Sequence, residues 1–367
     1  MKPTIVIFSN PFGYGPTGNA IPVIQSLLEQ TTARIVFAGS AFCAEILPVL
    51  PIERVLLDER NEEVIERYLQ TIDHPFVVGS QNRFCIAVAK RLRIPCAFID
   101  TLAWFWKEIP SSHLEADEIF WVKFPGIERK LLPDTSIHLI SSLLTPIPRS
   151  SEAVKDQLII QLGGVSYPLR EGLPTYYLEV LVAALNAFPS RRTYRRMIVA
   201  AGSQAILFLR ARLTNPLFEL HTFTKEAFVQ ELTQTAHLVT AAGISSTLEA
   251  FSAEIPTSFL LPLNLSQVAL TDLLEPVGAC PQQLTWETYV SVDEGLREMS
   301  ERDALPEIER YAQLLQKNES VLTRFSHDLQ EMCFAIPDQT GQEAFIRQLG
   351  DTGAQELVEI LKKVWSL

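Results

Sequence analysis

The sequence predicts an α/β protein built from two parallel, doubly wound domains. The chain has 367 residues, 47% of them hydrophobic, which is too long for one ordinary domain and sufficient for two sizeable cores. Short apolar strands alternate with amphipathic helical segments in both halves of the chain. Because such alternation is typical of parallel sheets flanked by helices, we expect two Rossmann-like domains.

The first domain is expected to cover residues 1–145. Its predicted strands lie near residues 4–9, 35–38, 54–57, 76–79, 96–99 and 119–123, and helical patterns fill the intervals. Residues 137–152 contain two prolines and a serine/arginine patch, and we interpret this segment as an inter-domain linker.

The second domain is expected to cover residues 152–335, where the alternation starts again. Strands are predicted at 157–162, 197–201, 218–221, 237–241 and 257–261, and helices at 174–188, 225–235 and 246–253. Residues 336–367 are predicted to form a helical tail that packs back on the first domain. In tandem domains of this kind, the carboxyl ends of both sheets are expected to face a shared cleft.

Composition excludes several classes of partner. A net charge of −12 opposes binding to nucleic acid, and we expect the basic cluster at residues 191–196 to be a solvated loop. The five cysteines form no C-x-x-C pair or zinc-like spacing, which predicts reduced thiols used for packing and no metal site. No apolar run reaches about 18 residues and no leader pattern opens the chain, so we expect a cytoplasmic protein without a membrane span.

A glycine-rich loop follows the first strand. Gly13-Tyr14-Gly15-Pro16-Thr17-Gly18 matches the G-x-G-x-x-G spacing of dinucleotide sites. However, three residues separate the strand from the glycines, and the second strand, at 34–41, ends without the acidic residue that a dinucleotide ribose requires. We therefore disfavour NAD or FAD. Backbone at Gly15 and Gly18 can still approach a ligand, and the following helix N-terminus favours negative charge.

A second glycine turn lies in the other half of the chain. A buried strand leads to Gly243, then Ser245, Ser246 and Thr247 open a helix, with Glu249 expected in its first turn. Backbone N–H groups and hydroxyls of this kind can hold a diphosphate, and a carboxylate can accept from both hydroxyls of a ribose. Ser246 and Glu249 also match a capping box, which needs no ligand, and the residues alone leave both interpretations open.

Three motifs in order resemble one enzyme family. Gly243 is followed by Glu249 after six residues and Pro256 after seven more, residues 18–22 read Gly-Asn-Ala-Ile-Pro, and residues 161–166 read Gln-Leu-Gly-Gly-Val-Ser. This pattern resembles the two-domain (GT-B) nucleotide-sugar glycosyltransferases, specifically the family of the peptidoglycan N-acetylglucosaminyltransferase that makes lipid II.

The resemblance implies roles for individual residues. It implies that the first glycine loop lies on the acceptor side of the cleft, that Gly163, Gly164 and Ser166 form a loop of the nucleotide-sugar domain, and that Gln267 contacts the donor sugar. The chain also departs from the family pattern: Asn19 replaces the loop histidine, and Leu270 replaces an asparagine. Asn19 is also a good N-cap residue, and the identity of the donor sugar does not carry over.

Without the loop histidine, the catalytic base must come from elsewhere. Asp100 ends the fifth predicted strand and is our first candidate, with Glu108 and His113 behind it. Trp104 and Trp106 could form a stacking wall for a ring-shaped acceptor. Asp100 could equally cap the following turn, and both tryptophans could be core residues.

Taken together, these features predict an inverting, metal-independent glycosyltransferase. It would use a nucleotide-diphosphate sugar, with UDP as the expected nucleotide, and a small or lipid-linked acceptor, without a cofactor. No D-x-D motif is present in the sequence, which fits a leaving group stabilised without a metal. The alternatives are a nucleotide-sugar 2-epimerase of the same fold and a non-catalytic nucleotide-sugar binder.

Overall fold

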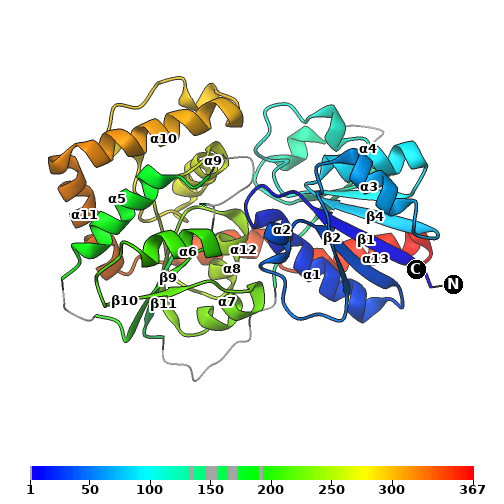
Figure 1. Cartoon of the computed structure of the whole chain (residues 1–367), viewed down its shortest axis with the longest axis horizontal. Helices are drawn as coiled ribbons and strands as arrows, with labels where there is room; N and C mark the ends of the chain where they lie inside the picture. Colours follow the sequence, from blue (N-terminus) through cyan, green and yellow to red (C-terminus); the bar gives the residue numbers. More distant parts are fainter. Residues whose placement is uncertain are drawn as a thin grey trace. The chain divides into compact units, whose positions relative to one another are not determined.

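The computed structural model describes residues 2–131, 136–145, 147, 155–163, 165, 172–189 and 193–367. The chain divides into two compact units, drawn in sequence colours in Figure 1. The first unit comprises Met1–Pro146 with Leu349–Leu367, and the second comprises Ile147–Gln348. Residues 336–348 therefore pack within the second unit, and residues 349–367 within the first.

The first unit contains a seven-stranded parallel sheet with the order β3-β2-β1-β4-β5-β6-β7. Its strands are β1 (Thr4–Ser9), β2 (Arg34–Gly39), β3 (Glu53–Leu56), β4 (Pro75–Ser80), β5 (Cys96–Asp100), β6 (Glu118–Val122) and β7 (Ile137–Ile140). Its helical segments are α1 (Gly15–Gln30), α2 (Ala41–Ala44), α3 (Glu62–Leu69), α4 (Arg83–Leu92), η1 (Ser111–His113), η2 (Ile127–Lys130) and α13 (Gly353–Trp365). β7 lies within the segment predicted to be a linker, so the first sheet extends farther along the chain than expected.

The second unit contains a five-stranded parallel sheet with the order β10-β9-β8-β11-β12. Its strands are β8 (Gln157–Gln161), β9 (Arg196–Ala200), β10 (Phe218–His221), β11 (Thr235–Thr240) and β12 (Thr257–Phe259). Its α-helices are α5 (Thr175–Asn186), α6 (Ser203–Arg210), α7 (Lys225–Leu232), α8 (Ile244–Ser252), α9 (Leu265–Leu274), α10 (Glu301–Lys317), α11 (Glu319–Phe334) and α12 (Thr340–Leu349). Arg196, expected in a solvated loop, instead begins β9 and pairs with Glu219 at 2.7 Å.

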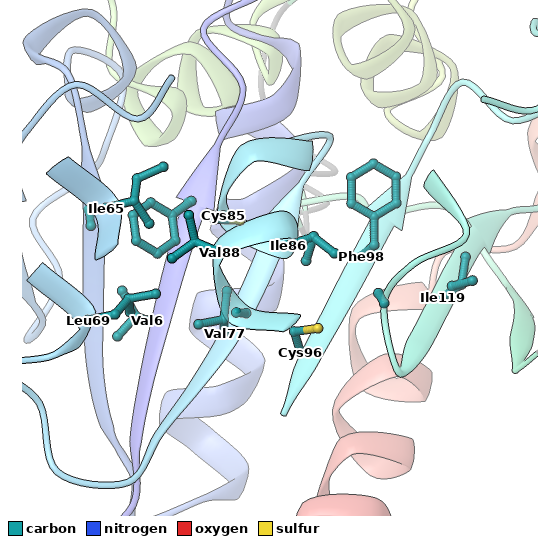
Figure 2. Packing of buried hydrophobic residues seen from close by; sticks show 14 of the residues in the cluster. Val6, Ile65, Leu69, Val77, Cys85, Ile86, Val88, Cys96, Phe98 and Ile119 are labelled. Atoms are coloured by element: carbon teal, nitrogen blue, oxygen red, sulfur yellow. The ribbon is translucent and has the colours of Figure 1, made fainter. Parts of the chain in front are cut away.

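The central strands are buried because helices cover both faces of a parallel sheet. Every residue of β1 is buried, which explains its unbroken apolar run. Figure 2 shows the core on one side of the first sheet, where Val6, Val77 and Phe98 of the sheet meet residues of α3 and α4. No helix among the described residues is long and apolar enough to cross a membrane.

The cysteines serve this packing, as predicted. All five are free thiols and buried. Burial raises the pKa of Cys43 and Cys96 to about 12, so these thiols stay protonated near neutral pH.

Helix α13 returns to the first sheet and lies against α1 and β7. The Glu356 carboxylate accepts hydrogen bonds from the Ser141 backbone N–H at 3.1 Å and from its hydroxyl at 2.7 Å. The backbone N–H of Gly353 donates to the Ser142 carbonyl at 3.3 Å. These bonds attach the end of the chain to the segment that follows β7.

Candidate functional site

The second glycine turn begins helix α8 directly after β11. Gly243 is the N-cap, with φ −80° and ψ 129°, and no side chain among the described residues caps it. The capping-box interpretation is wrong, because Ser246 lies three residues inside the helix. Glu249 lies in the second turn, not the first, because the helix begins two residues earlier than predicted.

The start of α8 differs from the starts of its neighbours. The side chains of Thr224 and Asn264 accept hydrogen bonds from the first turns of α7 and α9. The N-cap residue of α8 is Gly243, which has no side chain that could accept such a bond. Ser245 and Thr247 are buried on this turn, and Ser246 is partly exposed. The helix dipole favours an anion at this end of α8.

Glu249 forms an ion pair with Lys225, the first residue of α7. The Lys225 Nζ contacts Glu249 Oε1, and the two side chains are only 8% and 1% exposed. Sequence reasoning selected Glu249 but missed Lys225, because 24 residues separate them and nothing in the pattern around Lys225 marks it as buried. The carboxylate is therefore charge-compensated from inside the fold.

The other residues predicted for the nucleotide site have different settings. The Gln267 side chain stabilises the start of α9, because its Oε1 accepts a hydrogen bond from the Leu263 N–H at 2.7 Å. Gly163 follows β8, and a Cβ there would lie 2.3 Å from Nε2 of Gln161, so a larger residue would have to displace that side chain. Gly164 and Ser166 lie outside the described residues.

The first glycine loop leads into α1, which begins at Gly15. Gly13 adopts a left-handed φ of 65°, which favours glycine at the turn. Gly15 and Gly18 both lie in the first turns of α1, where Tyr14 is the N-cap. Asn19 is inside the helix, so its N-cap interpretation is wrong. Its Nδ2 instead donates to the Thr101 hydroxyl at 3.2 Å, which links the helix to the residue that follows β5.

Asp100 is the centre of a buried hydrogen-bonded group at the carboxyl end of β5. Its Oδ1 accepts from the Leu102 N–H at 2.8 Å, as the turn-capping interpretation predicts. Its Oδ2 contacts Trp106 Nε1 at 3.2 Å and His113 Nδ1 at 2.8 Å. The Asp100 side chain is fully enclosed, whereas His113 is 12% exposed. An outside molecule can therefore reach the imidazole but not the carboxylate.

The two tryptophans differ in their packing. Trp104 stacks on Phe124, with ring centroids 4.9 Å apart, and belongs to the core edge. Trp106 lies edge-on to His113, at 5.5 Å between centroids, and its indole N–H is engaged by Asp100. Both therefore support the turn, and Glu108 is exposed on the segment that follows it.

Lys130, which lies later in the sequence, hydrogen-bonds to the backbone of the same turn. Its Nζ donates to the carbonyl oxygens of Ala103 at 3.2 Å and Trp104 at 2.8 Å, and also to that of Trp106. Burial lowers the pKa of Lys130, and the Asp100 carboxylate counters this effect. Sequence reasoning missed Lys130, because a lone lysine in a polar segment carries no signal that its ammonium is directed at three carbonyl groups.

No metal site accompanies these groups in the described part of the chain, where no three His, Cys, Asp or Glu residues gather in a way that could hold an ion.

No protein-family model and no curated protein sequence matches the chain. Solved structures do match it over nearly its whole length. MurG of Acinetobacter baumannii is 15% identical with a TM-score of 0.51, and the match covers 99% of this chain and 100% of that one. MnaA of S. aureus, solved with UDP, is 14% identical with a TM-score of 0.54, covering 100% and 98%.

A third match is UGT89C1 of Arabidopsis thaliana complexed with UDP, which is 13% identical with a TM-score of 0.53, covering 98% of this chain and 100% of that one. Another structure of the same protein is complexed with quercetin. At these identities the likeness establishes the fold. The predicted α/β fold of the GT-B class, with two parallel sheets and flanking helices, is confirmed.

Proposed function

We propose that this protein transfers a sugar from a nucleotide-diphosphate sugar, with UDP as the nucleotide, to a hydroxyl or amine of a small or lipid-linked acceptor. The observation that carries the proposal is the contact of His113 Nδ1 with the enclosed Asp100 carboxylate at 2.8 Å. In this proposal His113 is the catalytic base, in place of the histidine that is absent at position 19. The fold it shares with two UDP-bound proteins supports the choice of nucleotide.

The donor side of the proposal uses the second unit. The diphosphate would bind at the N-terminal turn of α8, where the helix dipole favours an anion and which carries Ser245, Ser246 and Thr247. Glu249 would accept hydrogen bonds from the ribose hydroxyls. Because its side chain is only 1% exposed, a bound ribose must displace the groups that cover it and become enclosed with it. Gly163, which follows β8, would belong to the donor loop.

The acceptor side uses the first unit. When Nδ1–H of His113 donates to Asp100, the neutral ring carries its lone pair on Nε2, where it can take a proton. Asp100 then acts as a positioning residue, and His113 replaces it as the proposed base. Asn19, hydrogen-bonded to Thr101, lies in α1, which follows the glycine turn assigned to the acceptor.

The proposed reaction assigns the base to the first unit and the leaving diphosphate to the second. His113 Nε2 removes the proton from the acceptor hydroxyl while the acceptor oxygen attacks the anomeric carbon from the face opposite the diphosphate. The bond from that carbon to the diphosphate oxygen breaks, and the α8 N-terminus stabilises the departing charge. One displacement inverts the anomeric configuration. We propose that the leaving group is stabilised without a metal.

The first test is a thermal-shift panel with UDP, UDP-glucose, UDP-N-acetylglucosamine, UDP-glucuronate and NAD. A ligand at 100 times its Kd stabilises the folded state by about 2.7 kcal/mol. We expect uridine nucleotides to raise the melting temperature and NAD to leave it unchanged. The reverse result would exclude the transferase.

The second test measures release of UDP from the bound sugar nucleotide with and without candidate acceptors. Acceptor-dependent release supports transfer, release without acceptor supports an epimerase or hydrolase, and binding without release supports a non-catalytic binder. His113→Gln should reduce turnover by about 10²–10⁴-fold with UDP affinity unchanged. His138→Gln is the matched control, because His138 contacts Glu118 at 2.6 Å on the neighbouring strands.

A further inference from the structure

The Lys225–Glu249 pair is unusual among the ion pairs of the described residues. The other lysine or arginine pairs with carboxylates have side chains that are at least 22% exposed, whereas Lys225 and Glu249 are 8% and 1% exposed. Removing two charges from water is costly, and a buried ion pair is weak evidence for a role in stability. Stability alone therefore does not account for the burial of Lys225 and Glu249.

The position of Lys225 strengthens this point. It is the first residue of α7, where the helix dipole disfavours a positive charge. Thr224 already caps the helix, by accepting from the Ala227 N–H at 3.3 Å. An ammonium is thus not needed to begin α7, and the Lys225 ammonium contacts the Glu249 carboxylate.

We infer that Lys225 is the positioning residue for the ribose of the donor nucleotide. Its ammonium keeps the Glu249 carboxylate ionised and oriented through Oε1, and this determines how strongly the site prefers a ribose to a 2′-deoxyribose. The inference rests on the proposed function, which places the ribose hydroxyls on Glu249. The added residue, Lys225, lies on a different helix from Glu249 and acts on the carboxylate without contacting the sugar.

The physical basis is the strength of charge-assisted hydrogen bonds. An ionised carboxylate accepts from a hydroxyl about twice as strongly as a neutral acceptor does. Without Lys225, the enclosed Glu249 would lose the ammonium that contacts Oε1, which favours uptake of a proton or rotation toward other donors. The ribose hydroxyls would then lose their ionised acceptor. The affinity for a 2′-deoxynucleotide, which has one hydroxyl fewer, would fall less than the affinity for UDP.

The experiment compares binding of UDP and 2′-deoxy-UDP by calorimetry, using the full chain. We expect the parent to bind UDP at least about tenfold more tightly than 2′-deoxy-UDP. The reason is that a buried site discriminates against a ligand that leaves one of its polar groups, here the Glu249 carboxylate, without a hydrogen-bond partner. Lys225→Met should weaken UDP about 10- to 100-fold, change 2′-deoxy-UDP by less than about threefold, and so remove the preference. Lys225→Arg should retain it.

Lys155→Met is the matched control. The Lys155 Nζ donates to the carbonyl oxygens of Ala253 at 3.3 Å and Glu254 at 3.0 Å, at the other end of α8. This variant removes the same charge at the opposite end of α8 without touching the Glu249 carboxylate, so the preference for UDP should persist. If Lys225→Met does not fold, Lys225→Gln keeps an N–H donor to Glu249 without the charge, and the preference should fall at least about threefold.

Two results would overturn the inference while the proposed function stands. In the first, Glu249→Gln removes the preference for UDP, but the lysine variants weaken both ligands equally, which makes Lys225 a structural residue. In the second, Lys225→Met binds UDP more tightly, which makes the ammonium a competitor of the ribose. Failure of the parent to bind UDP at all would instead refute the proposed function, and the inference with it.

Discussion

Asp100→Asn separates positioning of His113 from simple support of the turn. The two oxygens of Asp100 have different partners: Oδ1 accepts from Leu102, and Oδ2 faces both Trp106 Nε1 and His113 Nδ1. An asparagine that keeps the Leu102 bond places its NH₂ where Oδ2 was. That group cannot accept from Trp106, and it forces His113 into the tautomer with hydrogen on Nε2.

The magnitude follows from these bonds. One indole hydrogen bond to a charged acceptor is lost and the histidine bond becomes a neutral one, so the first unit should lose about 2–4 kcal/mol of stability. Because the Nε2 lone pair is no longer available, turnover should fall by about 10²–10⁴-fold, and UDP affinity should not change.

Three measurements check this prediction. Urea unfolding gives the stability change, ¹⁵N chemical shifts of the imidazole give the His113 tautomer, and calorimetry gives the UDP affinity. Glu53→Gln is the control, because Glu53 pairs with Arg34 at the surface with side chains 43% and 54% exposed, and such a pair contributes about 0–1 kcal/mol. A loss below about 1 kcal/mol in Asp100→Asn, with the Nδ1–H tautomer retained, would refute the reasoning.

Three further predictions follow from buried contacts. Lys130→Met should cost about 1–3 kcal/mol in urea unfolding, because three carbonyl groups lose their donor, and an equal loss in Lys90→Met would contradict this. Burial lowers the pKa of His237 from 6.5 to about 4, so the stability it contributes is complete above pH 6.5 and falls by about 3 kcal/mol as the pH drops toward 4. His237→Gln should flatten that part of the pH–stability curve, and an unchanged slope would show that other groups cause it. Gly353→Ala should destabilise the first unit by about 1–3 kcal/mol, since its Cβ would lie 2.0 Å from the Ser141 carbonyl oxygen, and an unchanged urea midpoint would show that α13 shifts at no cost.

Local signals recovered most strands and located the glycine turns, but they misjudged where elements begin and end. β7 was interpreted as linker because its four residues, Ile137–Ile140, precede a proline-rich stretch, and their pairing with β6 is not visible in sequence. Asn19 and Ser246 looked like helix caps, yet α1 begins at Gly15 and α8 at Ile244. A side chain with capping chemistry marks a helix start only if the backbone before it is non-helical. Where the helix begins depends on how the segment packs against the sheet, which the local sequence does not show.

The sequence by itself determined the α/β class, the order of the elements and the two glycine turns, because hydrophobic periodicity and glycine spacing are local properties of the chain. It also placed Asp100 and Glu249 among the candidates. Only the tertiary structure decided their partners: His113 and Lys130 around Asp100, and Lys225 beside Glu249. The physical reason is that an enclosed carboxylate needs a compensating donor or charge, but any polar residue that the fold brings near can supply it, whatever its distance along the chain.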